Sequence, residues 1–350
     1  MLEVTAVPAK LMLKTPFHIA HGSCDYRENV FLQMKTDKKT AYGEAAVVPY
    51  YGVTKEQILE DLQRTITPAM IRENQTLDVV DSFSYTMSAC AYTTAMLGLQ
   101  EKAPDQPKSN SVRGSSFTIA YTSDMQRMVD AIAGCGFSTI KLKAGFPDDV
   151  QRITLIRERF PDLRIRLDAN QEWSFSEAQS IIEQLQDQHI ELIEEPIAGS
   201  PEALKVLSSP SGIPIILDET VQNLDDLKQY AGSASGIVVK LAKSGGPQAA
   251  KRLIEEAEKH SLDVLLSCMV ESSLAVTSAL TLEPLCRWID LDGPMLLADD
   301  PFSGLTYRNE LPFGTLQELS PSPKLAELFT STKPFILEQQ TYADTSTERR

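Results

Sequence analysis

The chain has 350 residues, of which 42% are hydrophobic and 23% charged, and its formal net charge is −15. An acidic chain without a lysine or arginine run lacks the basic patch that nucleic acid or an anionic membrane surface requires, so we expect a small-molecule substrate. No segment approaches the roughly 20 apolar residues of a membrane span, and the start of the sequence lacks a signal-peptide pattern, which predicts a cytoplasmic protein. The five cysteines are odd in number and widely spaced, which favours reduced thiols over a disulfide framework or a zinc site.

Residues 1–110 predict an α+β capping domain. The alternating stretch VFLQMKT is typical of a strand, and a YGEA turn and a segment of helical periodicity follow it. Thr54 and Gln57 form a capping-box pattern, so we expect a helix to begin there. The polar residues 101–116, with their prolines and serines, predict the linker into the next domain.

Eight short apolar runs in residues 111–300 predict the catalytic domain, a (β/α)7β barrel of the modified TIM type in the α/β class. The runs are FTIAYT, TIKLK, LRIRLD, IELIEE, IPIILD, GIVVK, LDVLLS and WIDLD. Charged residues at 143, 168, 194, 218 and 240 stand at or next to the ends of five of them at intervals of 25, 26, 24 and 22 residues, the spacing of a strand plus a crossover helix. Helix starts are predicted at the Ser174 and Glu177 capping box and at Pro247. Residues 301–350 are expected to return to the cap, and the last twelve, QQTYADTSTERR, to be disordered.

Alternation along five of these runs separates an apolar face from a charged face. In TIKLK, for example, Ile140 and Leu142 lie opposite Lys141 and Lys143. The outer face of a β/α barrel is covered by helices and must be apolar, so the charges point into the lumen. They lie at the C-terminal strand ends, where barrels of this kind carry their chemistry. Arg166 lies one step deeper and is expected to form a buried structural ion pair.

Asp168, Glu194 and Asp218 end adjacent predicted strands, with no cysteine or paired histidine nearby. Three carboxylates form an all-oxygen site suited to a hard cation. Mg²⁺ is favoured because it binds through few protein ligands and keeps positions free for water and substrate oxygens. In the alternative interpretation these carboxylates are only salt-bridge partners of the lumen lysines. Salt bridges alone would explain any one of these carboxylates, but they explain less well why three of them occur at this spacing.

The order of these motifs resembles the enolase superfamily, in its muconate-lactonizing subgroup. The matching motifs are KxK, the D of LDAN, the first E of EEP, the D of LDET, the K of VVKLAKSGG, YGEA at 42–45 and DLDGP at 290–294. The resemblance implies Mg²⁺ on the three carboxylates, with Glu194 rather than Glu195 as the ligand. It implies that Lys143 and Lys240 are acid/base residues on opposite faces of the substrate, and that Lys141 lowers the proton affinity of Lys143. Glu219 and Asn170 are expected to support the ligands, Glu219 by pairing with Lys240.

Two lysines on opposite faces imply a racemase or epimerase, an isomerase that removes a proton from one face and returns a proton to the other. Removing a proton beside a carboxylate requires stabilisation of the developing charge, which the metal ion supplies. A cycloisomerase or dehydratase could work with one acid/base residue and stays open. Further alternatives are a Schiff-base aldolase that uses Lys143 or Lys240, and a non-catalytic barrel whose charged lumen is structural.

Asp290 and Asp292 share a face at the end of the last strand and offer a site for a substrate ammonium group. In dipeptide epimerases of this subgroup a D-x-D motif binds the α-amino group, so the resemblance favours a dipeptide epimerase, and Met269 is expected beside the same substrate. An N-succinyl amino acid or a muconate would be repelled by the two carboxylates. o-Succinylbenzoate synthase, N-succinylamino acid racemase and a muconate-type cycloisomerase remain alternatives, because DLDGP can also be only a strand end plus a turn.

Two cap segments, FHIAHGSCDYR and PYYG, are expected to close over the barrel mouth and to select the side chain. Similar epimerases that act on Ala-Glu carry an arginine in the first loop, where this chain has Gly22, so Ala-Glu specificity is not supported. Arg27 could replace that arginine, whereas Asp25 would suit a cationic side chain. The sequence leaves this choice open, together with the oligomeric state, a homo-oligomer being possible, and the pathway.

Overall fold

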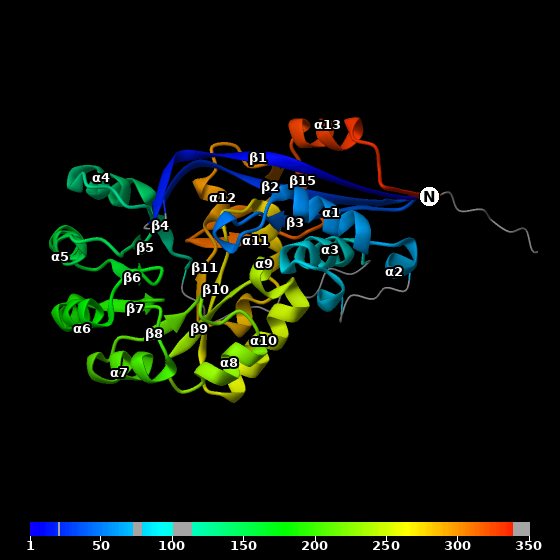
Figure 1. The fold of residues 1–350 in the computed structure, drawn as a ribbon. Coiled ribbons are helices and arrows are strands. Elements are labelled where there is room, and N and C mark those ends of the chain that lie inside the picture. Colours follow the sequence, from blue (N-terminus) through cyan, green and yellow to red (C-terminus); the bar gives the residue numbers. More distant parts are fainter. Residues whose placement is uncertain (20–21, 73–78, 101–113, 339–350) are drawn as a thin grey trace, which may run out of the picture.

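The computed structural model describes residues 1–19, 22–72, 79–100 and 114–338. An antiparallel sheet with its helices lies beside and above a β/α barrel (Figure 1). Most of the predicted linker, residues 101–113, and the predicted disordered tail, residues 339–350, lie outside the described residues. None of the helices in the described ranges is long and apolar enough to cross a bilayer.

The capping sheet has four antiparallel strands in the order β16-β1-β2-β3. The strands are β1 Leu2–Ile19, β2 Gly22–Thr36, β3 Thr40–Ala46 and β16 Ile336–Glu338. The helices beside the sheet are α1 Lys55–Thr65, α2 Pro68–Arg72 and α3 Thr86–Leu99, with 3-10 turns η1 Pro49–Tyr51 and η2 Val80–Ser82. The capping box predicted at Thr54 and Gln57 is confirmed, since both of its hydrogen bonds are present. Because β16 pairs with β1, the segment after the barrel returns to the sheet that the N-terminus begins.

The eight predicted strands form one parallel sheet in sequential order, which confirms the barrel. They are β4 Phe117–Ile119, β5 Thr139–Lys143, β6 Arg164–Asp168, β7 Ile190–Glu194, β8 Ile215–Leu217, β9 Gly236–Lys240, β10 Asp263–Ser267 and β11 Trp288–Asp290. The amide of Ser116 donates to the carbonyl of Ile289 at 3.3 Å, so the two ends of the sheet meet beside β4 and β11.

Helices alternate with these strands and cover the outside of the barrel (Figure 1). They are α4 Met125–Cys135, α5 Asp149–Arg159, α6 Phe175–Gln184, α7 Pro201–Ser211, α8 Leu224–Tyr230, α9 Leu241–Ser244, α10 Pro247–Lys259 and α11 Ser273–Ala279, with 3-10 turns η3 Gln186–Gln188 and η4 Glu283–Leu285. The predicted helix starts are confirmed, since Ser174 and Glu177 form a capping box and Pro247 is the first residue of α10. After β11 follow α12 Gly293–Leu296, α13 Pro323–Ser331 and two small ribbons, β12 Phe302–Ser303 with β15 Ser320–Pro321 and β13 Thr306–Arg308 with β14 Leu311–Phe313.

The predicted alternation of faces is confirmed. The outward residues, among them Ile140, Leu142 and Ile165, belong to the large core between the sheet and its helices. A separate buried cluster fills the lumen below the charged layer and consists of Leu192, Ile216, Val238, Leu265 and Trp288. The lumen is therefore a packed core under the strand-end charges, and it is not a pore.

Arg166 forms the predicted buried ion pair. Its Nε atom donates to Glu191 Oε2 at 2.6 Å, and one terminal nitrogen donates to the carbonyl of Ile289, also at 2.6 Å. The side chain is fully buried. It thus links β6 to β7 and to β11 across the floor of the lumen.

The long β1–β2 hairpin crosses the top of the molecule from the cap to the region of β4 and α12 (Figure 1). Its apolar side chains Val7, Leu11 and Phe31 pack into a core shared with α11 and α13. The amide of Ala298, beyond α12, donates to the carbonyl of Met12 at 2.8 Å. The hairpin is therefore fixed to the C-terminal side of the barrel.

Gly43 is required where β3 crosses α3. A Cβ atom at this position would lie 1.8 Å from the carbonyl oxygen of Ala91. We expect Gly43→Ala to lower the free energy of unfolding by about 1–3 kcal/mol, because the cap must shift to accept the methyl group.

Gly134→Ala is the control. Gly134 lies within α4 with open space around it, so this substitution should raise the free energy of unfolding by about 0.5–1 kcal/mol. Chemical denaturation of both variants tests this pair, and equal stabilities would contradict the close packing of β3 on α3.

Candidate active site

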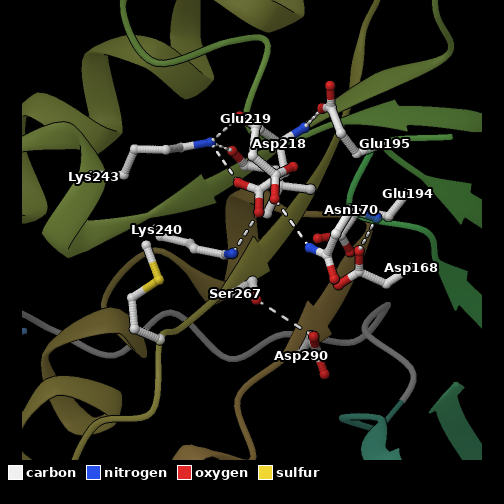
Figure 2. A network of polar contacts seen from close by, with 12 residues as sticks. Asp168, Asn170, Glu194, Glu195, Asp218, Glu219, Lys240, Lys243, Ser267 and Asp290 are labelled. Atoms are coloured by element: carbon white, nitrogen blue, oxygen red, sulfur yellow. Dashed lines mark hydrogen bonds and ion pairs between the residues drawn. The ribbon is translucent and has the colours of Figure 1, made fainter. Parts of the chain in front are cut away.

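The carboxyl ends of the barrel strands bring the predicted metal ligands together. Asp168 ends β6 and is in register with Glu194, the last residue of β7, and with Lys143, the last residue of β5. Asp218 follows directly after β8. Figure 2 shows these three carboxylates near one another, and each is at most 1% exposed. The register of adjacent strands therefore accounts for their proximity.

Lys143 and Lys240 reach one cavity from opposite walls. Lys143 ends β5 and Lys240 ends β9, and four steps in an eight-stranded barrel are half of its circumference. Both side chains line a cavity of about 90 Å³. The other predicted site residues that line it are Arg27, Lys141, Asn170, Glu219, Met269, Asp290 and Asp292.

Ion pairs join these carboxylates and lysines. Lys143 Nζ lies 2.6 Å from Asp168 Oδ2, and Lys240 Nζ lies 2.5 Å from Asp218 Oδ2. Lys141 Nζ lies 3.0 Å from Asp168, 2.8 Å from Glu194 and 3.0 Å from Asp290. Buried carboxylates require such compensation. Asp168 and Asp218 turn toward ammonium groups. In the part of the chain that the structure describes, no set of three acidic, His or Cys side chains has metal-ligating geometry.

Glu194 shows that the residues nevertheless fit a cation. It is completely buried, and neither of its carboxylate oxygens accepts a hydrogen bond. Burial and the neighbouring charge of Asp168 raise the pKa of Glu194 to about 8 despite the nearby Lys141. A buried carboxylate that shares Lys141 with Asp168 and Asp290, and whose oxygens accept no well-formed hydrogen bond, has the donor chemistry of a hard divalent ion.

The charges set the protonation of their neighbours. Burial alone would raise the pKa of Asp168 and of Asp218, but the adjacent lysine ammonium groups hold both values well below the usual range. Conversely, burial would lower the pKa of Lys240, and Asp218 together with further acidic groups raises it well above its usual value. Lys141 behaves in the same way, because three carboxylates surround it. In this arrangement the ion pairs keep all four groups charged.

Glu219 does not form the ion pair that the resemblance implied. Its Oε1 atom accepts a hydrogen bond from Asn170 Nδ2 at 3.0 Å, whereas Lys240 pairs with Asp218. Asn170 also accepts from Lys143 Nζ at 3.1 Å and has a positive φ of 45°, a conformation that asparagine tolerates. Asn170 thus connects the Lys143 side of the site to Glu219. Burial, with the charges of Asp218 and Asp168, raises the pKa of Glu219 to about 7.

Sequence reasoning missed Lys243. Its side chain is 1% exposed, and Nζ lies 2.7 Å from Asp218 Oδ1. It comes from α9, a single turn that Gly245 and Gly246 end with φ values of 93° and 108°. A Cβ on Gly246 would lie 1.9 Å from Thr93 Oγ1 in α3, so the glycine pair lets this turn pack against the cap. The KxxKxGG spacing in VVKLAKSGG was the available signal, but alternation along a strand does not extend into this turn.

Glu195, the second carboxylate of EEP, supports the neighbouring strand end. It is buried and has a positive φ of 44°. Its Oε2 atom accepts from the amide of Asp218 at 2.5 Å, and its Oε1 atom accepts from Gln171 Nε2 at 2.8 Å and from the hydroxyl of Thr220. Its side chain therefore fixes the chain just after β8 and takes a different place from Glu194.

Glu44, in the YGEA segment of β3, joins the cap to the barrel. It is 1% exposed and accepts hydrogen bonds from Asn29 Nδ2 at 2.7 Å and from the amide and hydroxyl of Ser272. Burial and the charge of Glu271 raise the pKa of Glu44 to about 8. Asn29 also donates to the carbonyl of Val270 at 3.2 Å. This network holds the loop after β10, which carries Met269, under the cap.

The cap contributes part of the predicted specificity region. Tyr50, in the PYYG segment, lines the site cavity, and its hydroxyl lies 3.8 Å from Met269 Sδ. Arg27 lines the same cavity and also a neighbouring groove of about 470 Å³, whose lining includes Asp25 and Glu28. Residues 20–21 and the side chains of residues 17–23, including the position of Gly22, lie outside the description.

A larger groove of about 560 Å³ lies beside β4 and α4. Its lining includes Phe117, Ile119, Met128 and Leu296, and no carboxylate. The smaller cavity is the candidate active site, because it alone of these two holds the strand-end charges.

Comparison with known proteins agrees with this geometry. A family model described as enolase C-terminal domain-like matches residues 123–302, which are 180 of the 350 residues. An L-Ala-D/L-amino acid epimerase of Flavobacterium johnsoniae is 27% identical over 85% of this chain and 93% of its own length. An N-acetyl-D-glutamate racemase of Pseudoalteromonas sp. is 30% identical over 77% of this chain and 88% of its own. A solved dipeptide epimerase from Enterococcus faecalis, complexed with Mg and L-Leu-L-Tyr, is 25% identical and superposes with a TM-score of 0.80, covering 91% of this chain and 99% of that one.

Both the matched segment and the barrel with its antiparallel cap are those expected from the order of motifs along the sequence. The chain therefore belongs to the enolase superfamily.

Proposed function

We propose that the protein is a Mg²⁺-dependent dipeptide epimerase that inverts the α-carbon of the C-terminal residue by two-base 1,1-proton transfer. The observation that carries the proposal is the entry of Lys143 and Lys240 into one cavity from opposite walls of the barrel. A planar intermediate bound between them presents one face to each amine. Proton removal on one face and proton delivery on the other inverts the stereocentre.

Asp168, Glu194 and Asp218 would hold the metal ion. When bound, Mg²⁺ supplies positive charge beside the substrate carboxylate, where negative charge develops as the α-proton leaves. The residues of the chain do the remaining work. Lys143 and Lys240 move the proton, each from a position beside one of the ligand carboxylates, and the apolar cluster below them keeps water out of the lower lumen.

The relatives support this choice of reaction. Curated relatives are named for epimerisation of L-Ala-D/L-amino acid dipeptides, and the Enterococcus faecalis structure contains Mg and a dipeptide. Racemisation of an N-acylamino acid is the second candidate, favoured by the similarity to N-acetyl-D-glutamate and N-succinyl-L-Arg/Lys racemases. Both candidates use the same lysine pair, so the substrate's amino end distinguishes them. The net charge of −15 and five free cysteines support work on a small molecule in the cytoplasm.

The two aspartates predicted to bind the ammonium group have different surroundings. Asp290 accepts from Ser116 Oγ at 2.6 Å and pairs with Lys141 at 3.0 Å. Burial would raise the pKa of Asp290, but Lys141, Ser116 and Arg166 hold it below its usual value. Asp292 accepts from the amide of Thr118 at 2.6 Å, and burial with the charge of Asp290 raises its pKa to about 7. Asp292 therefore gains more from a substrate cation, and we assign the ammonium group to it.

The first test is isotope exchange. In deuterated water the wild-type protein is expected to place deuterium on the α-carbon of the C-terminal residue of L,L-dipeptides while forming the epimer, with a mass gain of about one unit per exchanged proton. Chelation by EDTA should stop the exchange, and added Mg²⁺ should restore it. Exchange with N-acylamino acids and with no dipeptide would select the second candidate.

Single lysine variants test the two-base geometry. We expect Lys143→Ala and Lys240→Ala each to lose epimerisation by about 10²–10⁴-fold, because each removes one acid/base group. Each variant should still exchange the α-proton of one epimer, and the two variants should prefer opposite epimers. Circular dichroism and thermal unfolding control for folding. Two active variants, or variants that exchange the same epimer, would oppose lysines on opposite faces.

Isosteric variants test the different roles of Asp290 and Asp292. Asp290→Asn is expected to cost about 1–3 kcal/mol of stability, because it removes the charge of a buried acceptor beside Lys141 and Ser116, while Asp168 and Glu194 still neutralise Lys141. Asp292→Asn should cost little at low pH. A carboxyl whose pKa is higher in the folded than in the unfolded chain contributes stability that is lost as the pH rises through about 7. The neutral amide of the Asp292→Asn variant does not titrate, so the variant lacks this loss.

Melting temperatures at about pH 5 and about pH 8 measure this effect. The melting temperature of Asp292→Asn should rise relative to that of the wild type as the pH rises. In assays with dipeptides, Asp292→Asn should mainly raise KM. A pH-independent difference in melting temperature would contradict the raised pKa of Asp292.

A further inference from the structure

Lys243 is a buried cation that the proposed mechanism does not use. Its Nζ atom donates to Asp218 Oδ1 at 2.7 Å, to the carbonyl of Asp218 at 2.7 Å and to the carbonyl of Val238 at 2.9 Å. An ammonium group has three hydrogens, so these three acceptors saturate it. Lys243 is also not among the residues that line the site cavity. It has neither a free hydrogen nor access to a substrate.

The position of Asp218 explains why a bridge is needed there. β8 has three residues, and its ladder to β9 has two pairs, Ile216 with Gly236 and Leu217 with Ile237. Asp218 therefore lies beyond the last ladder pair. By binding the carbonyls of Asp218 and Val238 together, Lys243 joins the end of β8 to the middle of β9. Asp168, in contrast, is a paired residue of β6, with Lys143 of β5 on one side and Glu194 of β7 on the other.

The same ammonium fixes the Asp218 side chain. Lys243 takes Oδ1, so Oδ2 is the oxygen left toward the lumen, where Lys240 contacts it at 2.5 Å. Figure 2 shows Lys240 and Lys243 both directed at Asp218 from the same segment of chain. Mg²⁺ takes single carboxylate oxygens at near-ideal octahedral angles, so a ligand held in one orientation favours its binding.

We infer that Lys243 is a positioning residue that holds Asp218 with only Oδ2 available to the metal ion. The inference rests on the proposed metal site and deepens it. Lys243 has a net benefit for metal binding even though it is a cation, because the orientation of Asp218 outweighs the repulsion between two positive groups. If Lys243 acted only through its charge, removing it would strengthen metal binding, because a positive group near a cation repels it.

The test measures Mn²⁺ affinity by electron paramagnetic resonance of the free ion, on the full chain without substrate. Lys243→Met is expected to bind Mn²⁺ about 10–100-fold more weakly than wild type. Lys243→Arg, which keeps a charged donor, should recover part of that loss. Lys251→Met, an exposed lysine of α10, is the control for the removal of one positive charge and should bind as wild type does.

Unchanged or tighter Mn²⁺ binding by Lys243→Met would overturn the inference and leave the proposed function intact. Absence of Mn²⁺ binding by the wild type would instead remove the proposed metal site itself. If Lys243→Met does not fold, Lys243→Gln replaces it with the same criterion. Hydrogen exchange of the metal-free protein gives a second readout: residues 214–222 should exchange faster in the variant and residues 164–172 should not, and equal exchange in both segments would also overturn the inference.

Discussion

The arrangement of the site depends on mutual neutralisation of buried charges. The strand ends place Asp168, Glu194 and Asp218 beside Lys141 and Lys240 in a lumen whose lower part is filled by apolar side chains. In such surroundings an unpaired charge is costly, so every carboxylate must find a cation, a hydrogen-bond donor or a proton. Asp168 and Asp218 have ammonium partners and stay charged. Glu194 shares Lys141 with two other carboxylates, accepts no hydrogen bond and has a raised pKa, which makes it the group that gains most from a further cation.

The barrel was predictable from the sequence because its information is local and periodic. Side chains alternate between the two faces of a strand, so Ile140 and Leu142 point outward and Lys141 points inward independently of the rest of the chain. The features that could not be predicted depend on tertiary contacts, which leave no periodic pattern in the sequence. The low pKa of Asp290 depends on Lys141 and Ser116, which come from the other end of the barrel domain and approach Asp290 only when the sheet closes. Lys243 likewise cannot be found from the alternation of side chains along a strand, because it lies in a helical turn.

The cap shows the same limit. In the sequence Glu44 is distinguished only by its place in the YGEA motif, but in the structure its carboxyl group lies between Asn29 and Ser272 and so fixes the loop that carries Met269. Arg27 and Asn29 are two residues apart on β2, so both face the barrel, and both line the site cavity. The strand that holds the cap to the barrel is therefore also the strand that presents Arg27. In the proposed function, side-chain selection by Arg27 and cap attachment by Asn29 would be coupled through one short stretch of β2.

The two flanks of the cavity have a related design. Asp168 contacts Lys143, which lines the cavity, and Lys141, which is held by Glu194 and Asp290 as well. Asp218 contacts Lys240, which lines the cavity, and Lys243, which is held behind it by backbone carbonyls. Each flank thus has a carboxylate with one lysine directed at the substrate space and a second cation fixed by other groups. In the proposed reaction, the carboxylate would keep a positive neighbour when the first lysine gives up its proton. The proposed epimerisation runs in both directions and needs this on both faces, because each lysine would serve as base for one epimer and as acid for the other.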